Sequence, residues 1–221
     1  IQLRQSSILS VVQDNRLLGN LAHRLLEKLL AQSFKQWSKN DLDTWIQREI
    51  PPLLEKEGAT LLLYGREPER IAFTKQMKYA AWSLINLIKE NKWEVLATEA
   101  GVKGTINDLP INGRADLVLK RGGERAIIDL KWRGKARHTN LLSSGEDIQL
   151  ALYAKLLEPA STWAHTAYFI IEKGQLLVRN TRAFSGVQPV LDELDHEGVY
   201  EALLEKINAT YQWRLHQLEN G

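Results

Sequence analysis

The stretch that decides the fold runs from Gly113 to Trp132 and reads GRADLVLKRGGERAIIDLKW. Apolar and β-branched residues fill positions 115–119 and again 126–130, which indicates two β-strands. Gly122 and Gly123 lie between these runs and supply the backbone freedom that a two-residue hairpin turn requires. The stretch therefore predicts an antiparallel β-hairpin.

The turn fixes which side chains face each other across this hairpin. With the two glycines at its centre, Asp116 faces Asp129, and two positions further along Arg114 faces Lys131. Directly opposed side chains in an antiparallel pair have Cβ atoms only about 5 Å apart, and like charges placed there repel. We expect a divalent cation to compensate the repulsion between the two carboxylates.

The same hairpin places a lysine beside the expected ion. Asp129 and Lys131 are two positions apart on one strand, so both project from the same face. Two acids, a metal and a lysine suit hydrolysis of a phosphodiester. The metal polarises a phosphoryl oxygen and lowers the pKa of a bound water, and the lysine holds that water or shares the transition-state charge. The alternative is an ordinary hairpin with one aspartate turned to solvent. The apolar runs 117–119 and 127–128 favour strands covered on both faces, where a lone carboxylate is unfavourable.

Composition restricts the class of protein and the kind of metal site. The 221 residues are 44% hydrophobic and 25% charged, and they contain neither an apolar run long enough to span a membrane nor a signal-peptide pattern. We therefore expect a cytoplasmic protein. There are no cysteines, which excludes disulfides, zinc-cysteine sites and iron-sulfur clusters, so any metal must be held by oxygen and histidine. A net charge of +2 does not by itself identify a nucleic-acid binder.

The order of the patterns predicts one domain with three parts. We expect a mainly helical part over 1–92, a sheet core over 93–180 and C-terminal helices over 181–221. The chain begins at Ile1 rather than at a methionine, from which we expect a domain excised from a longer protein. No internal repeat, P-loop or dinucleotide-binding fingerprint is present in the sequence.

The helical part contains three predicted helices. Leucines at helical spacing predict the first over about 7–38, and within it Gly19, His23 and Glu27 recur at four-residue intervals on one side. A histidine there is either a packed core residue or a metal ligand. The second is expected over 41–57, capped near residues 40–41 and interrupted at prolines 51–52. The third is expected over 67–90, and its lysines and aromatics either line a nucleic-acid groove or form a solvated face with the aromatics turned inward.

The remaining patterns surround the hairpin. A strand is predicted over 93–100, in which Glu99 is either a further acid of the site or an exposed strand-end charge, and 101–112 is expected to be a loop or hairpin connection. The basic segment after Trp132 is either a solvated loop or a phosphate-binding one. A helix over 146–157, strands over 163–171 and 175–179, a short helix over 189–194 and a terminal helix over 199–218 complete the chain.

Four short motifs in this order resemble the RecB-type branch of the PD-(D/E)XK nuclease superfamily, which includes nuclease domains of bacterial recombination helicase-nucleases and CRISPR-associated exonucleases. GNLAHRLLE (19–27) resembles the family's helix with Gly-x-x-x-His, and GRADLVLK (113–120) its Gly-x-x-Asp strand. IIDLKW (127–132) resembles its Asp-x-Lys strand, and QLALY (149–153) its Gln-x-x-x-Tyr helix. The resemblance implies an α/β fold with a central mixed β-sheet flanked by helices, a restriction-endonuclease-like core, and an N-terminal helical elaboration.

The resemblance also implies roles for individual residues. The implied metal ligands are His23, Asp116, Asp129 and the backbone carbonyl of Leu130, with Glu99 as a further candidate. The implied metal is Mg²⁺ or Mn²⁺, and a histidine among the ligands suits Mn²⁺. Lys131 would act on the attacking water and the transition state, and Gln149 and Tyr153 would position the DNA backbone or Lys131. Contacts to DNA are expected from Arg114, Arg133, Lys135, Arg137, Gln149 and Tyr153.

The implied activity is metal-dependent hydrolysis of DNA to 5′-phosphate and 3′-hydroxyl ends, with an exonuclease of DNA repair, recombination or defence against foreign DNA as the leading interpretation. A structure-directed endonuclease and a non-catalytic DNA-binding or assembly module are the alternatives. Unlike many relatives, the chain has neither four cysteines for an iron-sulfur cluster nor a helicase motif. It would therefore belong to the cluster-free members, and a helicase or another domain is an expected partner.

Overall fold

The centre of the fold is a mixed five-stranded β-sheet in a computed structural model, which describes residues 15–106, 109–157, 163–191 and 196–220. The strands lie in the order β1-β2-β3-β4-β5. Their bounds are Glu94–Ile106 for β1, Leu109–Arg121 for β2, Glu124–Lys131 for β3, His165–Ile170 for β4 and Gln175–Val178 for β5. β3 and β4 are parallel and the other neighbours antiparallel. The predicted α/β class with a central mixed sheet is confirmed.

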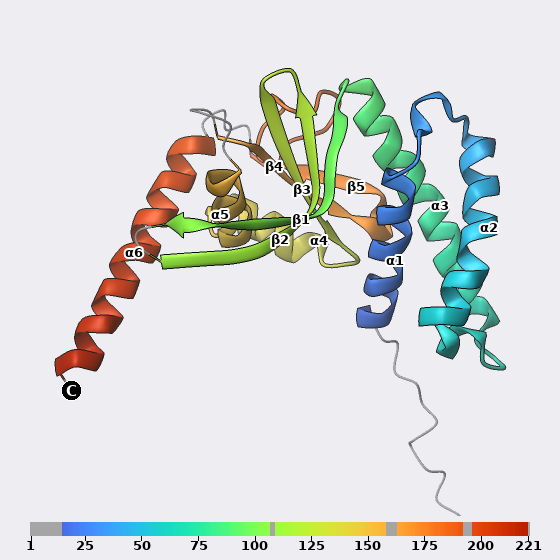
Figure 1. Ribbon diagram of the computed structural model, residues 1–221, viewed down its shortest axis with the longest axis horizontal. Helices are drawn as coiled ribbons and strands as arrows, with labels where there is room; N and C mark the ends of the chain where they lie inside the picture. Colours follow the sequence, from blue (N-terminus) through green and yellow to red (C-terminus); the bar gives the residue numbers. More distant parts are fainter. Residues whose placement is uncertain (1–14, 107–108, 158–162, 192–195, 221) are drawn as a thin grey trace, which may run out of the picture.

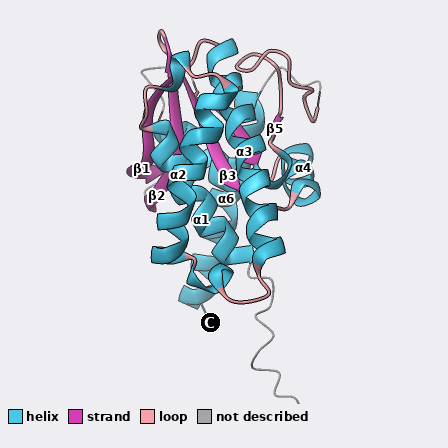
Figure 2. Ribbon diagram, turned by 90° about the vertical axis from the view of Figure 1, so that its right-hand side faces the viewer, coloured by secondary structure: helices cyan, strands magenta, loops and turns pink. Residues whose placement is uncertain are grey.

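Helices cover both faces of this sheet (Figure 1). On one side lie α1 (Asn15–Leu30), α2 (Lys39–Glu57) and α3 (Glu67–Glu90), and Figure 2 shows them in front of the strands. On the other side lie α4 (Lys135–Ser144), α5 (Ile148–Leu156) and α6 (His196–Asn220). Short 3₁₀ helices occupy Phe34–Gln36, Ala59–Leu62 and Ile171–Lys173. No described helix is both long and apolar enough to cross a membrane.

The apolar alternation of the central strands builds two cores, one on each face of the sheet. Leu117 and Ile128 are fully buried in the core beneath α1 to α3, whereas Val118 and Ile127 are buried in the core beneath α4 to α6. Full burial of each such side chain contributes roughly 1.5–3 kcal/mol. The prediction that both faces of the hairpin are covered is confirmed.

The predicted hairpin register is confirmed over most of its length. β2 pairs with β3 from Arg121 opposite Glu124 to Leu117 opposite Ile128, and Gly122 has the positive φ of 56° that the turn needs. The paired ladder ends at Leu117 opposite Ile128, one position before Asp116 and Asp129. Instead, the Asp116 carboxylate accepts a hydrogen bond of 2.7 Å from the Leu130 N–H, so a side chain takes the place of the strand pairing at this point.

The segment expected to be a connection is strand. β1 and β2 continue pairing from Gly101 opposite Arg114 to Ile106 opposite Leu109, and Figure 1 shows the resulting long hairpin reaching toward α6. Val102 is buried in the core beneath α5 and α6, and this burial holds the extended hairpin against the body. The polar and glycine residues of 101–112 interrupt the apolar alternation, so the sequence pattern did not predict that the strands extend here. The turn at 107–108 lies outside the described residues.

The helix bounds differ from the predictions at several places. The described part of the first helix begins at Asn15, and the expected residues 7–14 lie outside the described chain. The predicted interruption of the second helix is wrong, since α2 continues through Pro51 and Pro52 to Glu57. Buried Ile50, Leu53 and Leu54 hold this part of α2 in place despite the hydrogen bonds that the prolines remove. Its cap is Ser38, in a capping box with Asp41.

Two further expectations in the C-terminal half are corrected. The basic segment after Trp132 was expected to be a loop, yet it enters helix α4 at Lys135. Leu142 and His138 of this helix are buried and anchor it on the sheet. The segment is short and mostly polar, so its sequence pattern did not predict a helix. No helix forms at 189–191, and 192–194 lie outside the described residues. The C-terminal part therefore contains one described helix, α6.

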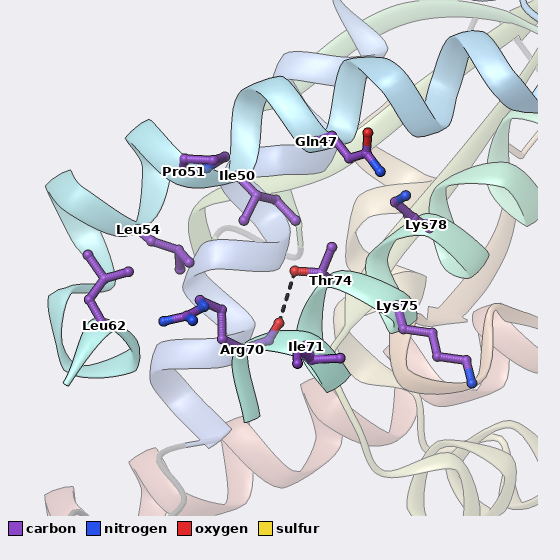
Figure 3. Close-up of a pocket in the computed structure, with 10 residues that line it drawn as sticks. All are labelled: Gln47, Ile50, Pro51, Leu54, Leu62, Arg70, Ile71, Thr74, Lys75 and Lys78. Carbon is purple, nitrogen blue, oxygen red and sulfur yellow. Dashed lines mark hydrogen bonds between the residues drawn. The ribbon is translucent and has the colours of Figure 1, made fainter. Parts of the chain in front are cut away.

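The lysines of α3 lie along a groove between α2 and α3 (Figure 3). Ile50, Pro51 and Leu54 of α2 line it opposite Lys75 and Lys78 of α3, around a volume of about 560 Å³. The groove is largely aliphatic and no aromatic side chain lines it. The expectation of inward aromatics on α3 is wrong for Tyr79, which is 62% exposed, whereas Trp82 packs half-buried against the core.

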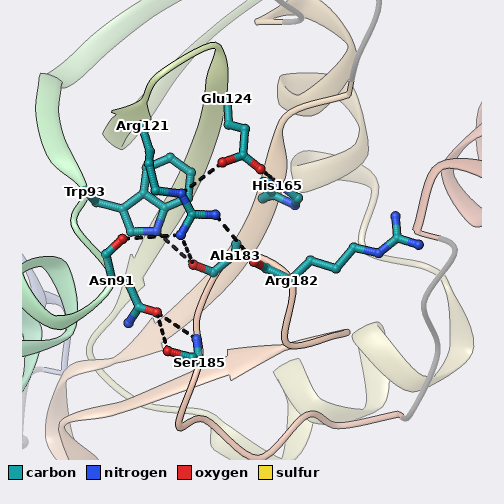
Figure 4. A network of polar contacts seen from close by, with 8 residues as sticks. All are labelled: Asn91, Trp93, Arg121, Glu124, His165, Arg182, Ala183 and Ser185. Carbon is teal, nitrogen blue, oxygen red and sulfur yellow. Dashed lines mark hydrogen bonds and ion pairs between the residues drawn. The ribbon is translucent and has the colours of Figure 1, made fainter.

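A polar network holds the turn of the β2–β3 hairpin (Figure 4). The Arg121 guanidinium lies 4.2 Å from the Trp93 ring centroid and donates to the backbone carbonyls of Asn91, Arg182 and Ala183. Its Nε also donates to Glu124 across the turn at 2.9 Å. The network connects the hairpin to the end of α3 and to the segment after β5, so the position of β3 is fixed from its N-terminal end.

A second network is buried beneath α6. Arg179 donates to Asp147 Oδ1 at 2.7 Å, and the Tyr200 hydroxyl donates to Asp147 Oδ2 at 2.9 Å. Thr166 of β4 hydrogen-bonds the same tyrosine hydroxyl. The Asp147 and Arg179 side chains are 0% and 3% exposed, so the two charges depend on each other for compensation. Asp147 directly precedes α5, and the network thereby positions that helix against the sheet.

Replacing Asp147 with alanine removes the carboxylate that lies 2.7 Å from the buried Arg179 guanidinium. We expect Asp147→Ala to lower the free energy of unfolding by about 3–5 kcal/mol, measured by urea denaturation. The neighbouring Glu146→Ala is the control, because Glu146 meets Lys206 only at 3.9 Å on the surface and its loss should leave the unfolding midpoint unchanged. Equal midpoints for both variants would contradict the role of the buried pair.

Candidate active site and metal centre

Helix α1 presents one polar stripe to a pocket at the edge of β2. Arg16, Asn20, His23 and Glu27 line this pocket of about 440 Å³ together with Glu99 and other polar residues. The helical spacing of these α1 residues could have identified the stripe, of which sequence reasoning named only positions 19, 23 and 27. Gly19 also lines the pocket, but an added Cβ would meet Trp132 Cβ at an ordinary 3.6 Å. Packing within the protein therefore leaves room for a larger side chain at position 19.

His23 connects α1 to the two central strands. Its Nε2 lies 2.9 Å from the Leu130 carbonyl oxygen, and its Nδ1 lies 3.7 Å from Asp116 Oδ1. The side chain is 29% exposed, so it is neither a core histidine nor a free surface residue. The histidine, the Asp116 carboxylate and the Leu130 carbonyl, which sequence reasoning grouped as metal ligands, lie together in the structure.

Glu99 is the third group at this position. His23, Glu99 and Asp116 each offer a ligand atom, and these atoms lie within 4.8 Å of one another. The β1–β2 pairing continues on both sides, with Thr98 opposite Leu117 and Ala100 opposite Ala115, which places Glu99 opposite Asp116. The like-charge opposition that the sequence predicted across β2 and β3 therefore occurs across β1 and β2.

The backbone of Glu99 is strained. Its φ of +50° lies in the left-handed region that side chains other than glycine rarely adopt. Such a conformation costs on the order of 1–3 kcal/mol and persists only where the surroundings determine it. Here the well-paired strand on either side holds Glu99 in place, with its carboxylate beside those of the site. Of the two readings of Glu99, this geometry favours the further acid over the exposed strand-end charge.

Asp129 lies apart from that group. Its side chain is 2% exposed, and its Oδ2 is 2.7 Å from Lys131 Nζ without hydrogen-bond geometry. Burial raises the pKa of Asp129 to about 6, and the Asp116 carboxylate adds to this shift while the Lys131 ammonium opposes it. The shared ion expected for Asp129 and Asp116 stays a prediction, and in the structure Asp129 is paired with Lys131 beside the cluster.

Tyr153 supports strand β2 from helix α5. Its buried hydroxyl accepts a hydrogen bond of 3.2 Å from the Arg114 N–H, and Gln149 Nε2 lies 3.5 Å from the same oxygen. A Cβ at Gly113 would approach the tyrosine ring to 2.8 Å, which explains the glycine at that position. Tyr153 therefore positions the strand that carries Asp116, and its contact to DNA stays a prediction. Gln149 is exposed.

The expected DNA-binding cations have different surroundings. Arg114 Nε lies 2.6 Å from Glu99 Oε2 at the pocket. Arg133 is held by Glu172 at 3.0 Å and by Asn15 Oδ1 at 3.0 Å, so much of its hydrogen-bonding capacity is used within the chain. Lys135 and Arg137 are exposed on the first turn of α4. The structure thus brings only Arg114 into the pocket and leaves the α4 cations on the surface.

His138 was not singled out from its basic neighbours by sequence reasoning. It is buried on α4, its ring centroid lies 4.5 Å from that of Tyr168, and its Nδ1 has no hydrogen-bond partner in the described chain. Burial, followed by the charges of Lys131 and Arg137, lowers the pKa of His138 to about 4. It is therefore neutral at physiological pH and contributes no charge to the basic segment. In the sequence, the burial of His138 could have been inferred only from its offset around the helix from the exposed Lys135 and Arg137.

The donor set fits a hard or borderline divalent cation. An imidazole nitrogen, two carboxylates and a backbone carbonyl converge, and these are ligands that Mg²⁺ and Mn²⁺ accept. The buried Asp129 Oδ2 without a hydrogen bond is a further oxygen beside them. Two opposed carboxylates also favour a cation between them electrostatically. The residues present therefore suit a metal centre.

Comparison with known protein families identifies the superfamily of the chain. The sequence model of the family described as the PD-(D/E)XK nuclease superfamily matches residues 2–219. No curated protein matches the chain significantly. The match includes every residue of the site described above.

The buried Asp129 carboxylate generates a prediction for the metal-free protein. A folded-state pKa of about 6 exceeds the ordinary 3.8, so the folded state holds this proton more tightly and the contribution of Asp129 to stability falls as pH rises through this window. We expect Asp129→Asn to stabilise the protein in EDTA by roughly 1–3 kcal/mol at pH 8, since each pKa unit corresponds to about 1.4 kcal/mol, and by little at pH 4.

Urea denaturation at the two pH values measures this effect. Glu94→Gln is the control, because Glu94 is an exposed carboxylate of β1 and its pKa is lowered by Lys35 rather than raised by burial. It should show no gain at pH 8. A wild type more stable than Asp129→Asn at pH 8 would mean that the ion pair with Lys131 outweighs the desolvation of the carboxylate.

Proposed function

The chain belongs to the PD-(D/E)XK nuclease superfamily, and from that membership we propose that it is a metal-dependent deoxyribonuclease acting as an exonuclease. One observation carries the proposal: His23, Glu99 and Asp116 offer ligand atoms within 4.8 Å of one another beside the Asp129–Lys131 pair. Acids and a histidine that can hold a metal, with a lysine nearby, suit hydrolysis of a phosphodiester.

The chain's own residues divide the work between binding and chemistry. His23, Glu99, Asp116, Asp129 and the Leu130 carbonyl would hold Mg²⁺ or Mn²⁺, which when bound supplies Lewis acidity toward a phosphoryl oxygen and a water of lowered pKa. Lys131 is 30% exposed and lies 2.7 Å from Asp129, so its ammonium would orient the attacking water and neutralise developing charge. Burial in the sheet keeps Asp129 in place to hold that lysine.

The order of three motifs supports membership of the RecB-type branch, and exposed cations support DNA as the substrate. The histidine on α1, the Asp-x-Lys strand β3 and the Gln-x-x-x-Tyr helix α5 occur in the order that this branch has. Exposed Lys135 and Arg137 precede the rest of α4 directly after β3, where they would neutralise backbone phosphates. Repair, recombination or defence against foreign DNA are the processes in which such an enzyme would act, with a helicase as a possible partner.

Two alternatives remain distinguishable by experiment. A structure-directed endonuclease would use the same residues on internal phosphodiesters. A non-catalytic DNA-binding module would keep the fold and lose the chemistry, but the acids and the lysine are all in place, which favours an enzyme.

Removing the lysine tests the catalytic assignment. We expect Lys131→Ala to lower kcat/KM at least about a hundredfold, because it removes a group that stabilises transition-state charge, while folding is kept. Lys120→Ala is the matched control: Lys120 is an exposed lysine of β2 paired with Glu94 at 3.7 Å, and its loss should leave cleavage unchanged. A Lys131→Ala protein with wild-type activity would refute the assignment.

The substrate arms of the same assay decide the kind of nuclease. Linear and covalently closed circular DNA, single- and double-stranded, and an RNA of the same sequence are incubated with Mn²⁺, Mg²⁺ or EDTA. Metal-dependent loss of linear DNA alone supports the exonuclease, and nicking of circles supports the endonuclease. Cleavage confined to RNA would overturn the substrate class. If the wild type binds DNA but cleaves it no faster than Lys131→Ala does, the binding module is supported.

The exposed cations of α4 give a separate prediction about binding. We expect Lys135→Ala and Arg137→Ala each to weaken DNA binding and to reduce the slope of log K against log salt concentration by about 1, since each removes one phosphate contact. The measurement is fluorescence anisotropy with a labelled oligonucleotide in EDTA. Lys103→Ala, on the distant part of the β1–β2 hairpin, is the control and should keep the wild-type slope.

A further inference from the structure

Arg114 forms an ion pair with the carboxylate of Glu99, which is also one of the candidate metal ligands. Its Nε lies 2.6 Å from Glu99 Oε2, a short ion pair between opposite charges. Glu99 is at the same time one of the three residues whose ligand atoms lie within 4.8 Å of one another. One carboxylate therefore faces two cationic partners, the guanidinium and the expected metal ion.

The pairing is local and reversible. The Arg114 side chain is 70% exposed, whereas that of Glu99 is 21% exposed and fixed by its strained backbone between well-paired strand residues. The arginine can therefore move away into solvent, but the carboxylate stays at the cluster. Arg24 in the same pocket is different, because it pairs with Glu27 and Glu57, which are outside the cluster.

We propose that Arg114 is a cation that holds Glu99 in the metal-free protein and is released toward the DNA backbone when the metal binds. The inference rests on the proposed metal centre and adds its regulation. The guanidinium and the metal ion would both draw on the negative charge of the Glu99 carboxylate, so metal binding would weaken the Arg114–Glu99 pair. The released guanidinium, on strand β2 two positions from Asp116, lies where it can donate to a substrate phosphate.

The competition has a reciprocal consequence. If metal binding frees Arg114 for DNA, then DNA that engages Arg114 removes the competitor and tightens the metal by the same factor. The site would assemble fully only when metal and DNA are both present. Arg114 is thus a positioning residue that couples two binding events.

The first test measures metal binding alone. Titration calorimetry of Mn²⁺ at 0.15 M salt, without DNA, compares wild type with Arg114→Ala. We expect the variant to bind Mn²⁺ about two- to fivefold more tightly, which corresponds to the loss of a competing partly exposed ion pair. Arg24→Ala is the matched control, an arginine of the same pocket without contact to Glu99, and should change the affinity by less than about 1.5-fold.

A double-mutant cycle separates contact from general charge. In the Glu99→Gln background the gain from Arg114→Ala should disappear, because the contested carboxylate is gone. The same gain in both backgrounds, an equal gain for Arg24→Ala, or no gain at all would overturn the inference. If the background binds Mn²⁺ too weakly to measure, the comparison with Arg24→Ala decides.

The second test measures the released arginine. In the Lys131→Ala background, which keeps DNA intact, Arg114→Ala should lower the slope of log K against log salt by about 1 with Mn²⁺ and leave it unchanged in EDTA. An equal change in both conditions would contradict release by metal. If wild type itself binds no Mn²⁺, the proposed metal centre fails; if it binds Mn²⁺ normally and only the Arg114 effects are missing, this inference alone fails.

Discussion

Mutual repulsion among three carboxylates is the constraint on which the site depends. Glu99 and Asp116 face each other across β1 and β2, and Asp129 lies close enough to Asp116 for its pKa to be raised further. Each carboxylate has its own compensating group. Asp116 accepts from the Leu130 N–H and lies near His23, Glu99 pairs with Arg114, and Asp129 pairs with Lys131. The metal-free protein is thereby folded around acids that a divalent cation can bridge.

The two apolar cores make this arrangement possible. β3 buries side chains on both of its faces, with Ile128 in one core and Ile127 in the other. Turning Asp129 outward would require a shift of the strand that moves both isoleucines out of their cores. The Arg121 network fixes one end of the hairpin (Figure 4). The buried Asp147 network fixes α5 against the sheet. The hydrophobic burial and these polar anchors together stabilise the acids in positions that they would not occupy by themselves.

The surroundings of the site combine fixed and exchangeable partners. Asp116 and Asp129 are held by the strand and by burial, whereas Arg114 and Lys131 reach the acids with partly exposed side chains. Tyr153 belongs to the fixed part, because its buried hydroxyl holds the backbone of Arg114. Under the proposed function, the fixed acids would hold the metal and the partly exposed cations would face the substrate.

The sequence by itself determined the hairpin, its register down to Leu117 opposite Ile128, and the mixed α/β class. These follow from local alternation and from a glycine turn, which act between neighbouring residues. The three-dimensional structure added that Glu99 lies opposite Asp116, that Arg114 pairs with Glu99, and that His138 is buried on a helix. The first two contacts lie across the β1–β2 hairpin, whose second half the sequence pattern had assigned to a connection. They depend on how β1 and the helices pack against the hairpin, which no local pattern encodes.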